Sequence, residues 1–165
     1  MTVKWSGNLE CFVLYLLPMK EAPGTIRVFQ IHSDREFELV FDLRARILQE
    51  EMGVPEDFDL DGNDHIANHY LAFVDNQPVG TARWRVTLGR KVKLERFAVL
   101  PEFRGKGIGR KLLDTIITDT PVGQEVFLEA HEEVVPFYEK NGFIRDGSSY
   151  DVSGILHQRM IFLSP

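Results

Sequence analysis

A glycine-rich, basic segment is the feature of this sequence that points most directly to chemistry. It reads Arg-Gly-Lys-Gly-Ile-Gly-Arg over residues 104–110, between a predicted strand and a predicted helix. The first N–H groups of a helix have no partner within it, and the helix dipole adds partial positive charge there. Glycines let the backbone approach an anion closely, and the basic side chains add charge. The segment therefore predicts a site for a ligand that carries phosphates.

The spacing of these glycines separates three phosphate-binding motifs. A dinucleotide fingerprint, Gly-x-Gly-x-x-Gly, would need glycine at Arg110, and a Walker A loop would need Gly-Lys-Ser/Thr after four spacer residues. The acyl-CoA pattern Arg/Gln-x-x-Gly-x-Gly/Ala fits at Arg104, Gly107 and Gly109. A helix start with incidental glycines is the purely structural alternative. Taken alone, the loop favours an acyl-CoA ligand.

Helices and strands on both sides of the loop must position it. A Ser-Asp-Arg-Glu capping box at residues 33–36 begins a helix that Gly53 and Pro55 end. A second long helix follows the loop with the apolar stripe Ile108, Leu112, Leu113, Ile116 and Ile117. A short helix is expected at 134–140, ended by Asn141-Gly142. Strands are expected at 11–17, 26–31, 70–74, 79–86, 92–100, 126–130, 143–144 and 158–163.

The order of these elements defines the fold class. Residues 56–68 are acidic and loop-like, and turns are expected at 76–78 and 89–90. A meander of strands precedes the glycine loop and a βαβ unit follows it. The sequence therefore predicts one mixed α/β domain.

Composition and charge limit the classes of function. The chain has 165 residues, which suits one domain, and a formal net charge of -6. That charge argues against a nucleic-acid partner, which requires a basic surface. Cys11 is the only cysteine, so a disulfide within the chain is impossible and a reducing, cytoplasmic compartment fits. The apolar run at residues 12–17 is too short to span a membrane and lacks the flanks of a signal peptide.

A second motif makes the sequence resemble a known superfamily. Val-Pro-Phe-Tyr-Glu-Lys-Asn-Gly-Phe at residues 135–143 is similar to the Phe/Leu-Tyr-x-x-x-Gly-Phe segment of the GNAT acyltransferases, which follows their fifth core strand. The resemblance implies an N-acetyltransferase domain over residues 26–165, with residues 1–25 as an extension that adds one strand. It also implies a twisted, mostly antiparallel sheet flanked by helices, whose fourth and fifth core strands splay apart. A core tyrosine is the alternative interpretation of Tyr138.

Further segments are similar to the ElaA/YjcF-like branch of the superfamily. These are residues 43–51, the acidic stretch that ends at His69, residues 94–100, and Gly-Ile-Leu-His at 154–157. The branch-matching polar positions are expected to line the acceptor pocket: Arg44, Glu51, Asp59, His69 and His157. Two positions depart from the pattern: His131 replaces an amide residue, and Leu156 replaces proline.

The resemblance implies direct transfer from acetyl-CoA to a primary amine. The cofactor would be held by Phe97, Ala98, Val99, Arg104, Gly105, Lys106, Gly107, Ile108, Gly109, Arg110, His131 and Phe137. Tyr138 would protonate the departing thiolate, because a phenol stays protonated at neutral pH. Glu95 is the first candidate for the base, with His69 and His157 as rivals. An ion pair with Arg44 or another core arginine is the alternative role for Glu95.

Other kinds of site and activity fit the sequence less well. Residues 57–62 copy the first half of an EF-hand loop, but Asn68 stands where a bidentate glutamate is needed. His65 and His69 have helical spacing without the glutamate of a zinc protease motif. No metal is therefore expected. A non-catalytic acyl-CoA-binding sensor on the same fold is the rival function. The sequence allows either a small molecule or a peptide as the acceptor amine. It is also compatible with a homodimer.

Overall fold

The structure is a computed structural model that describes residue 22 and residues 24–163. Its strands are β1 (Ile26–Gln30), β2 (Asn68–Val74), β3 (Gln77–Val86), β4 (Val92–Val99), β5 (Val126–His131), β6 (Phe143–Arg145), β7 (Tyr150–Val152) and β8 (Ile155–Phe162). Its helices are α1 (Asp34–Arg44), the π-helix η3 (Ala45–Glu51), α2 (Glu56–Asp59), α3 (Ile108–Asp119) and α4 (Val135–Glu139). Short 3-10 helices are η4 (Asp64–Ile66), η5 (Pro101–Phe103) and η6 (Glu132–Val134).

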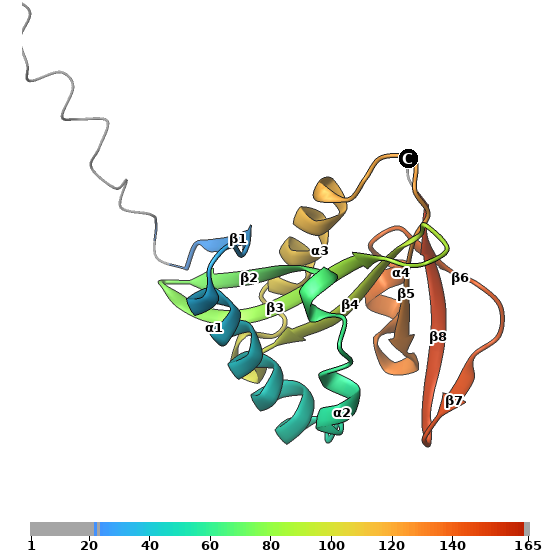
Figure 1. Cartoon of the computed structure of the whole chain (residues 1–165), viewed down its shortest axis with the longest axis horizontal. Helices are drawn as coiled ribbons and strands as arrows, with labels where there is room; N and C mark the ends of the chain where they lie inside the picture. The colour runs from blue at the N-terminus through green and yellow to red at the C-terminus, as the bar shows by residue number, and fades with distance from the viewer. Residues whose placement is uncertain (1–21, 23, 164–165) are drawn as a thin grey trace, which may run out of the picture.

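One sheet separates two layers of helices. The strand order is β1-β2-β3-β4-β5-β8-β6, with β7 paired to β8. Neighbouring strands are antiparallel except for β4 and β5, which are parallel. Figure 1 shows α1 and α2 on one face of the sheet, and α3 on the other. This arrangement confirms the predicted fold class.

The first helix begins where the sequence predicts. The side-chain oxygen of Ser33 accepts a hydrogen bond from the Glu36 N–H at 3.3 Å, and the Glu36 carboxylate accepts one from the Ser33 N–H at 3.0 Å. These bonds satisfy N–H groups that have no partner within the helix. α1 then continues as the π-helix η3, which periodicity did not indicate. The chain leaves η3 through Gly53, whose φ is 68°.

Two predictions for the connecting segments need correction. The β2–β3 hairpin turns at Asp75 and Asn76, with φ of 49° and 65°, and not at residues 76–78. Aspartate and asparagine tolerate this left-handed conformation, which suits a two-residue hairpin. Pro78 lies within β3, next to an irregularity in the ladder with β2. The acidic segment, expected to be a loop, contains α2 and η4, because acidic residues in the first turn stabilise a helix start.

The middle of the sheet opens between β4 and β5. β3 pairs with β4 at Thr81↔Ala98 and Arg83↔Glu95, so an extra residue is inserted in β4 between these two pairs. Arg96, in this bulge, has a φ of 56°. β4 and β5 are paired only along residues 92–94 and 126–128 and then diverge. The splayed strand pair expected of the fold is therefore present.

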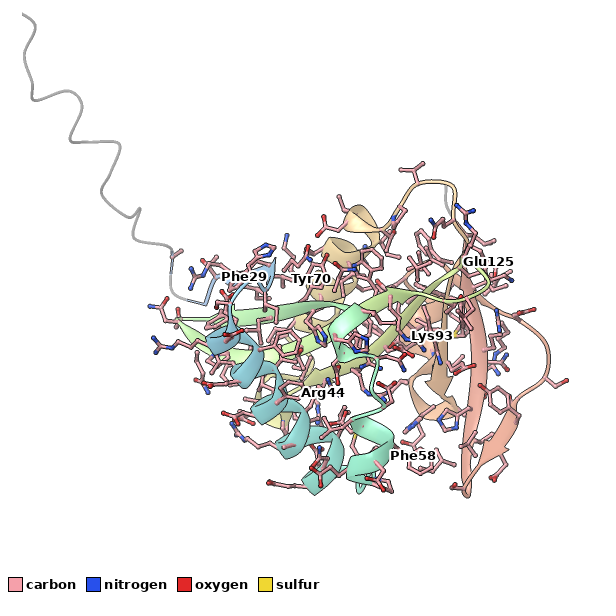
Figure 2. All side chains as sticks on the ribbon, viewed as in Figure 1. Phe29, Arg44, Phe58, Tyr70, Lys93 and Glu125 are labelled. Atoms are coloured by element: carbon pink, nitrogen blue, oxygen red, sulfur yellow. The ribbon has the colours of Figure 1, made fainter. Side chains whose placement is uncertain are left out.

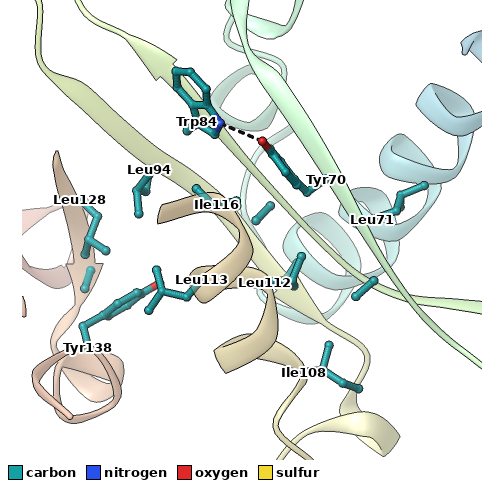
Figure 3. Packing of buried hydrophobic residues seen from close by; sticks show 14 of the residues in the cluster. Tyr70, Leu71, Trp84, Leu94, Ile108, Leu112, Leu113, Ile116, Leu128 and Tyr138 are labelled. Atoms are coloured by element: carbon teal, nitrogen blue, oxygen red, sulfur yellow. Dashed lines mark hydrogen bonds between the residues drawn. The ribbon is translucent and has the colours of Figure 1, made fainter. Parts of the chain in front are cut away.

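The core has one part between α3 and the sheet and another between the sheet and α1 with η3. The predicted stripe of α3 is buried at Ile108, Leu112, Leu113 and Ile116. Figure 3 shows these side chains packed among residues of the sheet and α4. A hydrogen bond of 2.9 Å from the Tyr70 hydroxyl to Asp119 attaches the sheet to the last turn of α3.

The C-terminal strands complete the sheet. Gly142 has a φ of 88°, as expected after the short helix, and leads into β6. β8 begins at Ile155, three residues before the expected start, because β7 pairs with it as a hairpin that the sequence did not indicate. The expected strand at residues 11–17 lies outside the described residues. Within the described part of the chain, no helix is long and apolar enough to cross a membrane.

Candidate active site

The glycine-rich segment connects η5 to α3. Gly105 and Gly107 have φ values of 72° and 86°, a region that glycine adopts without steric cost. Gly107 is the N-cap of α3, and a Cβ atom added to either glycine would meet no other atom within 4 Å. The approach to the first N–H groups of α3 is therefore open, as an anionic ligand requires.

Side chains of both signs and two aromatic rings border this loop. The Lys106 ammonium lies 5.1 Å from the ring centre of Phe103. Phe137 packs against Gly109, where an added Cβ would be 3.6 Å from the ring. Arg110 is exposed and forms an i,i+4 ion pair within α3 at 3.1 Å. The start of α3 and Phe137 of α4 are thus neighbours, whereas the side chain of Ile108 is buried in the core.

Arg104 is held by two other elements. Its Nε donates to the Val99 carbonyl at 2.9 Å, and its two Nη groups donate to the Glu51 carboxylate at 2.6 and 2.7 Å. These hydrogen bonds from Arg104 lower the pKa of the Glu51 carboxyl. Glu51, expected near the acceptor, therefore joins the end of η3 to the glycine loop.

The segment after the β4 bulge lies beside the opening of the sheet. Phe97, Ala98 and Val99 follow the bulge, where β4 is paired with β3 and no longer with β5. β3 comes close here, since a Cβ added to Gly80 would lie 3.0 Å from the Ala98 carbonyl oxygen. The unpaired edge of residues 97–99 offers backbone hydrogen-bonding groups to a ligand between β4 and β5.

Tyr138 lies where these elements meet. Its side chain belongs to the buried cluster that also contains Leu113 and Leu128 (Figure 3). Its ring meets Phe97 edge-on, with 6.2 Å between the ring centres. Among residues 22 and 24–163, no hydrogen-bond partner of the Tyr138 hydroxyl is found, and burial raises the pKa of this phenol. The site thus holds a protonated hydroxyl that is free to bond a ligand.

Glu95 is surrounded by positive charge. Its carboxylate accepts from Arg83 Nε at 3.2 Å and Arg85 Nε at 3.0 Å, and lies 3.3 Å from the Lys93 ammonium. Burial alone would raise the pKa of Glu95, but these three cations lower it. Glu95 is consequently a weak proton acceptor. Its catalytic role remains a prediction, and the ion pair expected as the alternative is formed with other arginines than Arg44.

Arginines bind the acidic segment beneath α1. The buried Arg44 donates from Nε to Asp59 at 2.9 Å and from Nη1 to Asp64 at 2.6 Å, and Figure 2 shows Arg44 on the side of α1 that faces the sheet. Arg83 donates to Asp64 at 2.6 Å and also to Asp61. Burial opposes ionisation of Asp64, but the two arginines outweigh it and lower its pKa. These contacts favour a structural role for the carboxylates that suggested an EF-hand.

Arg96 attaches the same segment to the bulge. Its Nε lies 3.2 Å from the Asp59 carboxylate, and its Nη2 donates to the Phe58 carbonyl. The left-handed backbone of Arg96 points this side chain toward α2 and away from the regular alternation of β4. Sequence reasoning missed Arg83 altogether, since an arginine within a strand gives no local sign of its partners.

His69 is buried against the same network. Its Nε2 is 3.0 Å from the Asp64 carbonyl oxygen and therefore carries the hydrogen. Its Nδ1 has no hydrogen-bond partner within the described structure. Burial lowers the pKa of His69, despite the bond to Asp64, which raises it.

Two histidines meet on the other side of the opening. His131 ends β5 and is paired in register with His157 of β8. Their ring centres are 4.6 Å apart and the rings are nearly perpendicular. The ring of Tyr150 stacks on His157 at 6.0 Å. Burial and the neighbouring His157 lower the pKa of His131. Sequence reasoning assigned these histidines to different ligands and did not predict their contact.

The five residues expected to line the acceptor pocket occupy three places. Arg44, Asp59 and His69 belong to the buried network beneath α1, Glu51 is bound to the glycine loop, and His157 lies on β8. Their common role in acceptor binding stays a prediction.

Comparison with known sequences gives consistent matches. Residues 50–163 match the family model described as an acetyltransferase (GNAT) domain. A protein of Bacillus subtilis (strain 168), named provisionally as an acetyltransferase, is 31% identical over 140 residues, which cover 82% of this chain and 95% of that protein. The uncharacterized N-acetyltransferase YjcF of the same organism is 29% identical over 133 residues, covering 78% and 94%.

Solved structures share the fold. Escherichia coli ElaA superposes with a TM-score of 0.76 at 24% identity, over 84% of this chain and all of that one. A GNAT family acetyltransferase from Elizabethkingia anophelis, solved with acetyl-CoA bound, gives a TM-score of 0.61 at 17% identity, over 82% and 94% of the two chains. The similarity to ElaA and YjcF agrees with the branch expected from the sequence.

Proposed function

The chain belongs to the GNAT acetyltransferase family, and is an acyltransferase, and we propose that it transfers the acetyl group of acetyl-CoA directly to a primary amine. One observation carries the proposal: β4 and β5 diverge between the glycine loop and Tyr138. A ligand that crosses this opening would have one end at the helix start and the other at the phenol. The Elizabethkingia anophelis protein of the same fold binds acetyl-CoA, which supports this donor.

In this proposal the glycine loop and the segment after the β4 bulge bind different parts of acetyl-CoA. The phosphates lie at the start of α3, where Gly107 leaves room and Lys106 and Arg110 supply charge. The pantetheine arm lies along the unpaired edge of residues 97–99, whose backbone groups hold the thioester. The residues proposed to contact the donor are those of the sequence prediction: Phe97, Ala98, Val99, Arg104, Gly105, Lys106, Gly107, Ile108, Gly109, Arg110, His131 and Phe137.

Tyr138 is proposed to be the acid that protonates the leaving thiolate. The geometry supports this role, because the side chain is buried and its hydroxyl is protonated and without a partner among the described residues. A structural tyrosine in a core is expected to hydrogen-bond through its hydroxyl, as Tyr70 does to Asp119. The contrast between these two buried tyrosines favours a ligand as the partner of Tyr138.

The acceptor is proposed to approach from the face that carries α2. The carboxylates of Glu56 and Asp57 are exposed there, and the formal net charge of the chain is -6, so a positively charged amine would be attracted. Arg44, Asp59 and His69 would act by holding this segment in place, since all three side chains are buried and bonded within it.

Calorimetry and an enzyme assay test the proposal in sequence. Acetyl-CoA should bind, whereas NAD and ATP should bind at least tenfold more weakly, because the loop lacks the glycine patterns of the dinucleotide and Walker A motifs. Release of free thiol from acetyl-CoA is then measured with a panel of primary amines. Tight NAD binding without acetyl-CoA binding would reject the donor, and absence of turnover with every amine would reject the reaction.

A further inference from the structure

A primary amine is protonated at neutral pH, so acetyl transfer requires a group that accepts its proton. Glu95 is poorly suited to this task, because Arg83, Arg85 and Lys93 stabilise its ionised form. His69 is also poorly suited, because it is only 2% exposed and its Nε2–H is bonded to the Asp64 carbonyl. We therefore expect another residue on the face that carries α2 to accept the proton of the amine.

His157 is oriented by its own hairpin. Its Nδ1 lies 2.9 Å from the Ile155 carbonyl oxygen, which can only accept, so Nδ1 carries the hydrogen. In the neutral ring this leaves Nε2 unprotonated and basic. A backbone carbonyl thus fixes both the tautomer and the direction of the ring.

The face on which His157 lies follows from the alternation of side chains along β5 and β8. Leu128 and Ala130 of β5 belong to the buried cluster that contains Tyr138. The intervening residues point the other way: Glu129 pairs with Lys93 at 2.7 Å, and His131 meets His157. Figure 2 shows Lys93 on the part of the sheet between α2 and β8. The histidine pair and Tyr138 therefore lie on opposite faces, on either side of the opening between β4 and β5.

The charge of the His131–His157 pair depends on its burial and on the charged groups around it. Burial and His157 lower the pKa of His131, while the Glu133 carboxylate raises it. The pair therefore favours binding one proton over two, because two adjacent imidazolium ions repel each other. The titratable and charged groups on the surrounding elements are Glu129, Glu132, Glu133, Tyr150, Asp151 and Arg159.

We propose that Nε2 of His157, in contact with His131, accepts the proton of the acceptor ammonium in the acetyl transfer. This inference rests on the proposed function. The ammonium gives one proton to Nε2, and the free amine attacks the thioester carbonyl carbon from this face. The C–N bond forms, and the C–S bond breaks with its electron pair on sulfur. Tyr138 protonates the sulfur from the opposite face. The nitrogen releases its second proton to water, and water returns a proton to the Tyr138 phenolate. His157 finally releases its proton to water.

His157→Asn is the sharpest test, because the asparagine amide can still donate to the Ile155 carbonyl while Nε2 is deleted. Each amine of the panel is assayed beside its β-trifluorinated analogue, whose nitrogen is far less basic and is unprotonated at neutral pH, so that it has no ammonium proton to give to His157. We expect kcat/KM for the ordinary amines to fall about a hundredfold. For the fluorinated amines the fall should be less than about fivefold, and the Kd of acetyl-CoA should not change. His65→Asn, an exposed change on η4, is the matched control.

The outcomes separate this inference from the proposed function. Equal losses with both kinds of amine would show that His157 only supports the structure, and unchanged kinetics would also overturn its role. In both cases the wild-type protein still acetylates the amines, so the proposed function is not contradicted. If the wild-type protein acetylates no amine, the proposed function fails and this inference fails with it. If His157→Asn does not fold, His157→Gln is measured in the same way.

Discussion

Replacing Tyr138 with phenylalanine isolates the hydroxyl on which the proposed chemistry depends. The substitution keeps the ring that meets Phe97 at 6.2 Å and Phe143 at 5.7 Å. The hydroxyl has no hydrogen-bond partner among the described residues, so its removal breaks no bond within them. We therefore expect the free energy of unfolding to stay the same or to rise by about 1 kcal/mol. For a chain of this size that corresponds to an increase in Tm of about 2–4 °C.

The kinetics of Tyr138→Phe should change in the opposite sense. Loss of the acid should lower kcat about a hundredfold, equivalent to about 2.7 kcal/mol in the barrier, with little change in the KM for acetyl-CoA. Steady-state assays and melting curves on the same preparation measure both effects. Because burial raises the pKa of Tyr138, no titration of this group should appear in the pH profile at neutral pH. A normal kcat would refute the acid role, and a fall in Tm of several degrees would show that the hydroxyl is structural.

Three further predictions concern the loop and the buried charges. Gly107→Val and the control Gly123→Val introduce the same strain, with φ of 86° and 80° and open space at both, so both should lose about 1–2 kcal/mol of stability. Only Gly107→Val should weaken acetyl-CoA binding in calorimetry, by at least tenfold; equal affinities would remove the loop from the site. Arg83→Met should lower the free energy of unfolding in urea by about 3–5 kcal/mol, and by more than Arg85→Met, because it removes a fully buried cation that pairs with three carboxylates. The pKa values of these carboxylates are lowered in the folded state, so the unfolded chain binds more protons near pH 4, and stability should decrease as the pH falls from about 5 to 2. Constant stability over that range would contradict this account.

Local signals in the sequence predicted the parts of the fold that local interactions determine. The capping box at Ser33 and Glu36 and the left-handed Gly142 lie where expected, because the responsible atoms are close in sequence. The motif around Tyr138 and the glycine loop could likewise be recognised from the sequence, since each is a continuous segment. The two-residue turn at Asp75 was misplaced because Pro78 suggested a turn and instead lies in a strand.

Contacts between distant segments could not be predicted in this way. Glu51 and Arg104 are 53 residues apart, and neither has a neighbour that indicates the other. Arginine rarely adopts a left-handed backbone, so the conformational preferences of the residues do not predict a bulge at Arg96. The meeting of His131 and His157 depends on the register of β5 with β8, which the sequence does not specify. The roles assigned to these residues therefore remain predictions for experiment.

The way in which α2 is attached has a consequence for the diversification of this protein. Arg44, Arg83 and Arg96 come from three elements and bind backbone carbonyls or buried carboxylates of the acidic segment. The apolar side chains between these anchor points, Phe58 and Leu60, are 61% and 41% exposed and take no part in that attachment. Phe58 and Leu60 can therefore be replaced without detaching α2 from the rest of the domain. A combinatorial library at these two positions would alter the proposed entrance for acceptors and leave the proposed donor site unchanged.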